Sequence, residues 1–302
     1  MILATVRNFG LVLLFCVAPS PRAAAQGAGG AAADGPAPFD GLVEVGGGRR
    51  LRLRCSGASP AGGPTVVLES GAGNDSTAWD RVQPEVAKFA RVCAYDRAGL
   101  GGSDPVPAPR SIVAVTEDLR ALLRNAKAAG PYVLVGHSLG GILARLYASY
   151  YPAEVAGMVL VESAHEDEAD RALRLIPRET YKEMLKRLGP ADLIPQLGEP
   201  IDSCSIRPLM NALDWRADVP LVVLTQGRPY GPDMVAVPST APQAYRLHLE
   251  LQRDLARRSP GGRHVIARKS GHAVHRDEPG LVVEAVRRVF DEVRGGRRRR
   301  RI

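Results

Sequence analysis

The sequence has no hydrophobic run long enough to cross a membrane as part of a mature chain. The apolar stretch at residues 9–18 is shorter than the roughly 20 residues that a transmembrane helix needs. The sequence also lacks a cluster of metal-ligating side chains and a glycine loop of the kind that cradles phosphates. We therefore expect no stable membrane span after processing, no metal and no cofactor.

Little of the net positive charge lies outside the C-terminal end. The formal net charge is +8, and five of the positive charges are the arginines at 297–301. An arginine run can bind nucleic acid or anionic lipid, but no aromatic residues interleave with this one, as base stacking would require. We expect a solvated, frayed tail at 297–302, a nearly neutral domain before it, and no nucleic-acid partner.

The N-terminal end has the organisation of a secretory signal peptide. Arg7 supplies a positive charge, residues 9–18 supply an apolar segment, and the alanines at 23–25 supply a small-residue cleavage site. Residues 26–38, rich in Gly, Ala and Pro, predict a disordered linker. These features predict a signal peptide over 1–25 and an exported protein, periplasmic or extracellular. A retained N-terminal anchor is the alternative.

Cysteines are few. Cys16 lies in the predicted leader, so Cys55, Cys93 and Cys204 remain. An exported compartment permits disulfides. If the strand-like segments that contain Cys55 and Cys93 are antiparallel neighbours, these two can bridge and leave Cys204 free. Two buried thiols are the alternative that the residues leave open.

From residue 39 onward, strand-like and helix-like segments alternate. A hairpin is predicted over 39–55, and further strands are predicted over 65–69, 91–95, 132–135, 155–161, 221–225 and 264–267. Helices are predicted over 78–89, 112–127, 245–258 and 281–293, with Asp118 and Arg120 facing outward from the second. Such alternation predicts a largely parallel sheet covered on both faces.

One stretch interrupts the alternation, at about residues 166–217. It contains helix-like pieces at 167–175 and 179–188 but no predicted strand, which favours a helical lid over a site. Its apolar residues either line a pocket or form the lid's own packing face. They are Leu173, Leu175, Ile176, Met184 and Leu188. Its charges Glu166, Asp167 and Glu168 are expected to face solvent.

The most informative segment is Gly136-His137-Ser138-Leu139-Gly140. It joins the apolar strand-like run at 132–135 to a segment of helical spacing at 141–148. A G-x-S-x-G motif between strand and helix is a nucleophile elbow, in which a tight turn exposes the serine Oγ. Ser138 is therefore the predicted nucleophile, and His137 fills out the turn.

A serine hydroxyl needs a base, and the base needs an acid to orient it. His272, just after the strand at 264–267, is the predicted base, with His275 as its substitute. Glu162 is the favoured acid because it ends the strand that follows the elbow, and a strand end is a rigid position. Asp233, in a loop rich in Gly and Pro, is the alternative acid.

Two backbone N–H groups are needed to hold the oxyanion of an acyl-transfer reaction. One is expected from Leu139, the residue after the nucleophile. The other is expected from the small-residue loop at 70–74, with Ala72 as the first choice and Gly73 as the second.

Four segments together carry a family resemblance: 67–73, 95–103, 136–141 and 271–272. In this order they resemble an α/β-hydrolase fold protein, of the branch with a helical cap that includes esterases and epoxide hydrolases. The resemblance implies a mostly parallel eight-stranded sheet with helices on both faces, a short cap, and a domain over 39–296. It also implies that the second and fourth strands are neighbours, which favours a Cys55–Cys93 bridge.

The sequence departs from the family pattern at two places. Ser70-Gly71 stands where many relatives have His-Gly, and no Asp follows the strand at 221–225 directly. Serine at the elbow argues against epoxide hydrolase and dehalogenase chemistry, which uses an aspartate there. The resemblance implies hydrolysis of a small-molecule carboxylic ester, thioester or lactone. Alternatives are a proline iminopeptidase-like or C–C bond hydrolase, and a non-catalytic ligand-binding protein.

Overall fold

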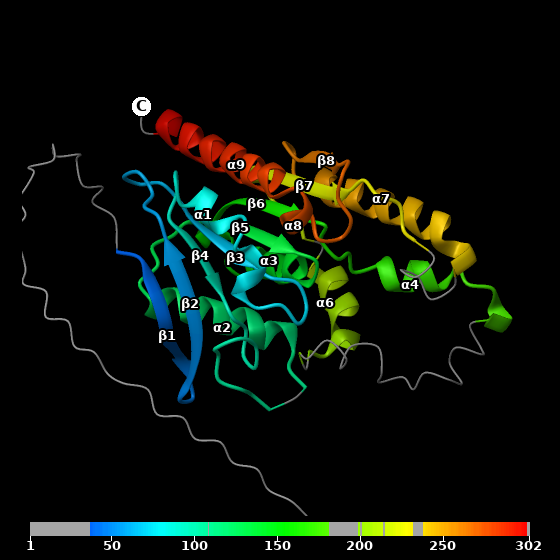
Figure 1. The fold of residues 1–302 in the computed structure, drawn as a ribbon, viewed down its shortest axis with the longest axis horizontal. Coiled ribbons are helices and arrows are strands. Elements are labelled where there is room, and N and C mark those ends of the chain that lie inside the picture. Colours follow the sequence, from blue (N-terminus) through cyan, green and yellow to red (C-terminus); the bar gives the residue numbers. More distant parts are fainter. Residues whose placement is uncertain are drawn as a thin grey trace, which may run out of the picture. The chain divides into compact units, whose positions relative to one another are not determined.

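An eight-stranded sheet forms the centre of the computed structural model, with strand order β1-β2-β4-β3-β5-β6-β7-β8 (Figure 1). The strands β1 and β2 form an antiparallel hairpin, β2 pairs antiparallel with β4, and the remaining neighbours are parallel. The strands are β1 (Phe39–Gly46), β2 (Arg49–Ser56), β3 (Thr65–Glu69), β4 (Val92–Tyr95), β5 (Tyr132–His137), β6 (Val155–Val161), β7 (Leu221–Gln226) and β8 (Arg263–Ala267). This sheet confirms the predicted fold class.

The structure describes residues 37–107, 109–180, 199, 201–213, 215–231 and 238–300, except for the side chains of 203, 238 and 297–300. All of them belong to one compact unit. The predicted signal peptide over 1–25, nearly all of the predicted linker and part of the predicted lid lie outside these residues.

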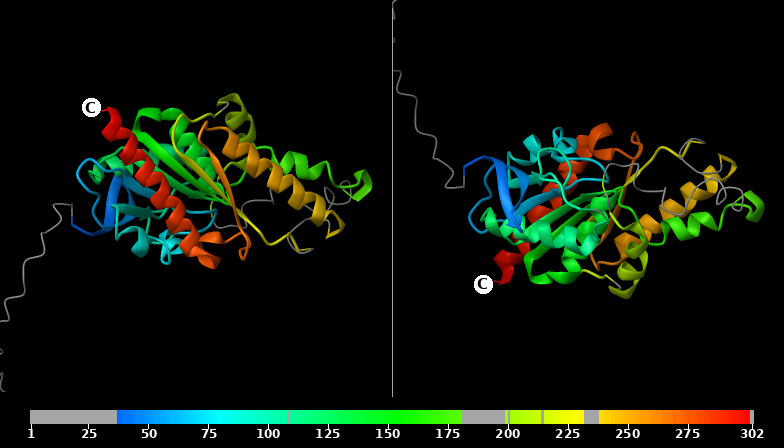
Figure 2. Two further views of the ribbon diagram at one scale, coloured as in Figure 1. Left: turned by 90° about the horizontal axis from the view of Figure 1, so that it is seen from above. Right: turned by 90° about the horizontal axis from the view of Figure 1, so that it is seen from below.

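The inner strands are buried on both faces because helices cover both. On one face, β-strand side chains pack against α2 (Ile112–Asn125), α3 (Leu139–Tyr150) and α7 (Ala241–Arg257). On the other, they pack against η1 (Ser76–Trp79), α1 (Gln83–Val86), α8 (Val274–Asp277) and α9 (Pro279–Arg300). Figure 2 shows α9 in front of the sheet from above and behind it from below. All five residues of β3 are buried, and its centre at 66–68 is apolar, as is typical of a strand covered on both faces.

Three short 3-10 turns and two further helices complete the elements of the described residues. The turn η2 (Pro152–Glu154) precedes β6, and α4 (Glu168–Leu173) follows it. The turn η4 (Ser203–Ser205) leads into α6 (Ile206–Leu213), and η6 (Pro238–Thr240) leads into α7. The elements α4 and α6 lie in the region predicted to be a helical lid.

The helix predicted over 78–89 is wrong as a single element. The chain instead forms η1 and then α1, with Pro84 in the first turn of α1. Proline has no N–H to continue a preceding helix, so it begins a new one. Toward the C-terminus, α9 runs to Arg300, so four of the five arginines expected to be frayed continue a helix.

The outward orientation predicted for Asp118 is also wrong. Its side chain is buried, and its carboxylate lies 2.7 Å from Arg49 and 2.8 Å from Arg110. Arg120, predicted to face outward with it, is partly exposed and pairs with Glu154 at 2.7 Å. Helical spacing alone cannot identify a buried charge whose partners come from distant parts of the chain.

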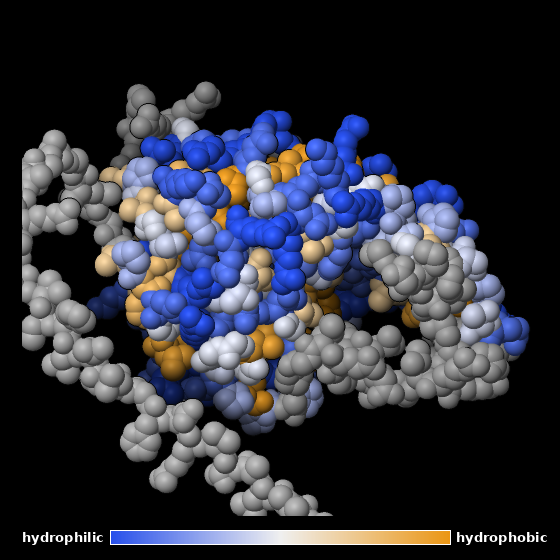
Figure 3. Space-filling view, viewed as in Figure 1, coloured by the Kyte–Doolittle hydropathy of each residue, from blue (hydrophilic) through white to orange (hydrophobic). Residues whose placement is uncertain are grey.

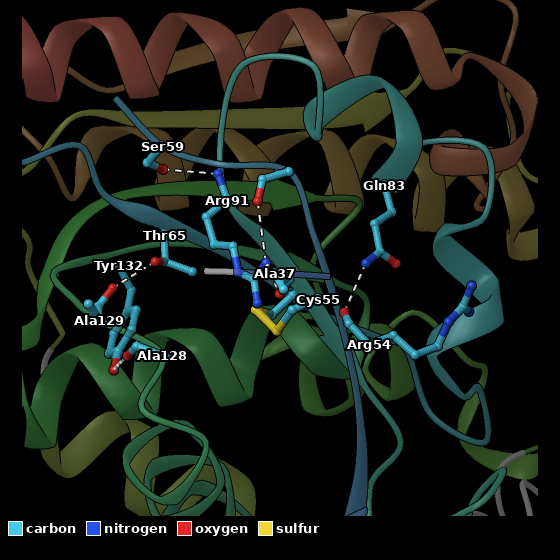
Figure 4. Close-up of a disulfide and its surroundings, with 12 residues drawn as sticks. Ala37, Arg54, Cys55, Ser59, Thr65, Gln83, Arg91, Ala128, Ala129 and Tyr132 are labelled. Atoms are coloured by element: carbon cyan, nitrogen blue, oxygen red, sulfur yellow. Dashed lines mark hydrogen bonds between the residues drawn. A yellow bond between two sulfur atoms is a disulfide. The ribbon is translucent and has the colours of Figure 1, made fainter. Parts of the chain in front are cut away.

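A disulfide joins the hairpin to the parallel part of the sheet (Figure 4). Cys55 of β2 and Cys93 of β4 are paired directly in the register of these antiparallel strands. Cys204 is an exposed free thiol. Of the two possibilities that the residues left open, the structure therefore shows the bridge.

Hydrophilic residues cover much of the face in Figure 3, with apolar residues between them. Among the helices that the structure describes, none is both long enough and apolar enough to span a membrane.

Candidate active site

Ser138 lies in a strained turn between β5 and α3. Its backbone has φ 52° and ψ −119°, a conformation that residues other than glycine rarely adopt. The glycines around it allow close packing. A Cβ at residue 136 would lie 2.4 Å from the Gly140 carbonyl oxygen, and one at residue 140 would lie 2.3 Å from the Glu69 carbonyl oxygen. The motif thus supplies both the turn and the space that a nucleophile elbow needs.

Glu162 and His272 are brought together at the edge of the sheet where the parallel strands end. Glu162 directly follows β6 with φ 49°, and its side chain is fully buried. Its Oε1 lies 3.7 Å from His272 Nδ1, and its Oε2 accepts a hydrogen bond from the Gln226 backbone N–H at 2.7 Å. Burial raises the pKa of Glu162, but the histidines beside it outweigh burial and lower the pKa below its ordinary value. The alternative acid, Asp233, lies outside the described residues.

His137 supports the predicted base. Its Nε2 donates to the His272 carbonyl oxygen at 3.0 Å, and the two rings are 4.8 Å apart. Burial lowers the pKa of His137 well below its ordinary value, so the ring is neutral. His272 itself is half exposed, with 51% of its side chain accessible.

His275 has a different environment. It is buried, and its ring lies 5.0 Å from that of Trp79 and 4.3 Å from that of His137. Burial and the nearby Arg276 lower the pKa of His275 to about 4. The ring of His275 thus packs against Trp79 and His137, whereas His272 is the histidine of the two that contacts Glu162.

The loop after β3 lies against the nucleophile. A Cβ on Gly71 would be 3.3 Å from Ser138 Cβ, and Ala72 and Leu139 line the same pocket as Ser138. Leu139 is the first residue of α3, so its N–H has no partner within the helix. The Gly73 N–H, in contrast, donates to Glu199 at 3.1 Å. This bond favours Ala72 over Gly73 as the second oxyanion donor.

A buried arginine holds this loop in place. Arg97 donates to the carbonyl oxygens of Ser70 at 2.6 Å and Gly71 at 2.7 Å, and it pairs with Glu69 at 2.7 Å and with Glu199. The sequence placed Arg97 in a family-like segment without giving it a role. Glu199 gave no signal at all, because its partners come from distant parts of the chain.

A cavity of about 290 Å³ opens beside Ser138. Its lining is mostly apolar and comes from α3, the segment after β6, α4 and α6. The lining residues are Ala72, Ser138, Leu139, Ile142, Ala164, His165, Glu166, Ala169, Glu199, Ile201, Ile206 and Arg207. The apolar residues that the lid region contributes are Ala169, Ile201 and Ile206 rather than those named from the sequence.

Five apolar lid residues were expected either to line a pocket or to form the lid's own packing face, and the three that the structure describes do not line this cavity. Leu173 is 40% exposed, and neither Leu175 nor Ile176 is part of the lining. Met184 and Leu188 lie outside the described residues. Helical periodicity located the lid but could not tell which of its side chains face the serine.

The cavity wall also contains a buried carboxylate, Glu166, which was expected to face solvent. It pairs with Arg145 of α3 at 2.7 Å and with Arg258, just after α7, at 2.6 Å. Burial raises the pKa of Glu166, but the two guanidinium groups outweigh burial and lower it to about 2. Asp167 pairs with Arg207 at 3.0 Å, and Glu168 is partly buried.

Within the part of the chain that the structure describes, no group of His, Cys, Asp and Glu side chains is arranged to hold a metal ion. The structure places Ser138 at the cavity with Ala72 and Leu139, and the Glu162–His272 contact at the sheet edge where the parallel strands end.

Comparison with known proteins places this arrangement in a family. An uncharacterized protein of Bacillus subtilis is 27% identical over 224 residues, which cover 74% of this chain and 82% of that protein. An uncharacterized vacuolar membrane protein of Saccharomyces cerevisiae is 42% identical over 108 residues, but the match spans only 17% of that protein.

A solved structure shows the same fold. An esterase from Thermogutta terrifontis matches with a TM-score of 0.59 at 22% identity, covering 84% of this chain and 99% of the esterase chain. The sequence model of the alpha/beta hydrolase fold matches residues 64–227, more than half of the chain, including the elbow. The chain therefore belongs to the α/β-hydrolase fold family.

Proposed function

We propose that this chain is a serine hydrolase that cleaves carboxylic esters, thioesters or lactones through an acyl-enzyme on Ser138. The observation that carries the proposal is the strained Ser138 turn beside the cavity, with the Glu162–His272 contact at the same sheet edge. A serine nucleophile, a histidine base and a carboxylate that orients the histidine are the groups that acyl transfer needs.

The proposed reaction uses these groups in two halves. Ser138 Oγ attacks the carbonyl carbon as His272 takes its proton, and the amides of Leu139 and Ala72 hold the oxyanion. The tetrahedral intermediate collapses, and the leaving alcohol takes the proton from His272. Water then attacks the acyl-enzyme, again giving its proton to His272, and the acid leaves as Ser138 recovers its proton.

The cavity favours a compact, uncharged acyl group. At about 290 Å³ it lies at the lower end of the range for small-molecule sites. Its two carboxylates are each paired with arginine, Glu166 with Arg145 and Arg258 and Glu199 with Arg97. A carboxylate engaged in this way is poorly suited to reading a substrate amine, which disfavours the iminopeptidase alternative.

We also propose that the chain is exported. The Cys55–Cys93 disulfide supports this proposal, because disulfides persist mainly in oxidising compartments. Fractionation of cells that express the full chain tests the proposal. A processed protein outside the cytoplasm supports it, and an unprocessed protein in the cytoplasm contradicts it.

The test of the activity is hydrolysis of a p-nitrophenyl ester series of increasing acyl length by the full chain, beside Ser138→Ala. We expect multiple turnovers on short acyl chains, a decline on long ones, and loss of turnover in the variant. A folded wild-type chain without turnover on any ester would redirect the search to peptides, C–C substrates or binding alone.

A further inference from the structure

A second histidine contacts the predicted catalytic acid. His248 of α7 has its Nε2 2.8 Å from Glu162 Oε1, whereas His272 Nδ1 is 3.7 Å from the same oxygen. The His248 side chain is only 3% exposed. The acid's oxygen is therefore shared between the predicted base and a buried imidazole that the proposed mechanism does not use.

The other nitrogen of His248 contacts the lid region. Its Nδ1 lies 2.7 Å from Glu168 Oε1 on α4, and the Tyr230 hydroxyl donates to the same Glu168 oxygen at 3.3 Å. His248 Nδ1 forms a hydrogen bond with Glu168, whereas the Nε2–Oε1 contact with Glu162 is an ion pair whose geometry makes no hydrogen bond. Negative charge on both sides of the ring stabilises the positively charged imidazolium. Burial lowers the pKa of His248, but these two carboxylates outweigh burial and raise it to about 10.

The four groups form a chain of alternating charge from α4 to the base. A pair of Glu162 and His248 alone would be neutral overall, and it would stabilise a protonated His272 weakly. Glu168 adds a second negative charge at the far end, so the three groups together keep one net negative charge beside His272. That charge is needed when His272 takes the proton from Ser138.

We propose that His248 and Glu168 are positioning residues of this hydrolase. His248 holds Glu162 in place through their ion pair, and Glu168 of α4 restores the negative charge that His248 neutralises. The inference rests on the proposed function, since it concerns the same acid. It makes α4 part of the catalytic apparatus as well as a wall of the cavity: the acid is fully effective only when α4 lies against α7.

The chain supplies a matched control on the same two helices. Arg171 of α4 pairs with Glu250 of α7 at 3.0 Å, and both side chains are well exposed. The substitution Glu250→Gln removes this link between α4 and α7 without touching the acid. Glu168→Gln removes the charge at the end of the alternating chain from a side chain that is 28% exposed, so the variant is expected to fold.

The experiment measures kcat and KM on p-nitrophenyl acetate for the full chain and its Glu168→Gln, Glu168→Asp, His248→Gln and Glu250→Gln variants. Groups that hold a functional side chain typically contribute about 10- to 100-fold in metal enzymes. We expect Glu168→Gln and His248→Gln to lower kcat about tenfold or more with little change in KM. Glu168→Asp should recover part of the loss, and Glu250→Gln should match the wild type.

Two results would overturn the inference. One is a wild-type kcat in a folded Glu168→Gln variant, and the other is an equal loss of kcat in Glu250→Gln, which would make α4 a simple tether. Nitrogen NMR of the His248 ring in the full chain separates this inference from the proposed function. A doubly protonated His248 ring near neutral pH supports the chain of alternating charge, whether or not the protein cleaves esters. A neutral His248 ring contradicts it, even if the protein cleaves esters.

Discussion

At the scale of single residues, the site depends on positions where no side chain fits. Gly71 faces the nucleophile across the elbow: a Cβ there would lie 2.7 Å from His137 Nδ1 and 3.3 Å from Ser138 Cβ. His137 is buried and holds the His272 carbonyl, so it cannot move aside freely. Any side chain at residue 71 must therefore displace the loop that carries Ala72.

We expect Gly71→Ala to lower kcat/KM by about 10- to 100-fold while the protein stays folded, because a shift of the loop moves the oxyanion donor. The control is Gly280→Ala, where a Cβ meets nothing within 4 Å. Kinetics on a short p-nitrophenyl ester and a thermal melt of both variants provide the measurement. Unchanged kcat/KM in Gly71→Ala would show that this loop does not hold the oxyanion.

The sequence identified Ser138, His272 and Glu162 as candidates because each stands at a recognisable junction, at or just after the end of a strand. It did not identify His248, whose signal is weaker. His248 and Gln252 are polar residues four apart on the buried face of α7, between Leu247, Leu251 and Leu255. A buried polar pair on an apolar stripe indicates partners from elsewhere in the fold, but spacing cannot name those partners.

At the scale of elements, buried ion pairs and hydrogen bonds connect the lid region and the loop at 70–74, which we call the oxyanion loop, to the sheet. Arg97 is 2% exposed and pairs with Glu69 at the end of β3 and with Glu199 of the lid region. Removing one member of a buried ion pair typically costs about 3–5 kcal/mol because its partners stay charged and buried.

We therefore expect Arg97→Ala to lower the free energy of unfolding by about 3–5 kcal/mol. Lys88→Ala, which removes an exposed pair with Glu85, should change it little. Urea unfolding of the two variants beside the wild type decides the matter. Equal stabilities for all three proteins would mean that the Arg97 cluster adds nothing to the fold.

Glu166 gives a pH-dependent prediction for the contact between β6, α3 and the end of α7. Its pKa in the folded state is about 2, whereas an unperturbed glutamate has a pKa of about 4.3. A lowered pKa stabilises the fold above the unfolded value, and this stabilisation is lost as the pH falls from about 4.3 toward 2.

The difference in unfolding free energy between the wild type and Glu166→Gln should therefore be largest near neutral pH. This difference should become smaller below a pH of about 4. Denaturant titrations of both proteins from neutral to acid pH measure this gap. A gap that stays constant or widens in acid would contradict the ion-pair account of Glu166.

Most strands were predictable because runs such as 66–68 and Val155–Val161 are without polar side chains, as is typical of buried parallel strands. The lid was predictable only as a region. Which of its side chains line the cavity depends on how α4 and α6 pack, and the contacts between these segments, such as the ion pair Arg207–Asp167, join residues 40 apart that no local pattern brings together.

At the scale of the whole molecule, the disulfide ties the N-terminal hairpin to the sheet. Cys55 and Cys93 are separated by 38 residues, and closing a loop of this length is expected to stabilise the folded state by about 4 kcal/mol. The loop contains β3, η1 and α1, so the bridge restrains the strand that leads into the oxyanion loop.

Replacing both cysteines with alanine should lower the free energy of unfolding by about 4 kcal/mol. Cys204→Ser, at an exposed free thiol, should leave it unchanged. Chemical denaturation of the three proteins under non-reducing conditions measures both effects. A double variant as stable as the wild type would show that the bridge is dispensable for the fold.

The most direct test of the central claim is covalent trapping of the nucleophile. The full chain is incubated with diethyl p-nitrophenyl phosphate, and the modified protein is digested and sequenced by mass spectrometry. We predict one equivalent of p-nitrophenolate released, one diethylphosphoryl group on Ser138, and neither in Ser138→Ala. A folded wild-type chain that stays unmodified, or that carries the group on another residue, would contradict the assignment of Ser138 as the nucleophile.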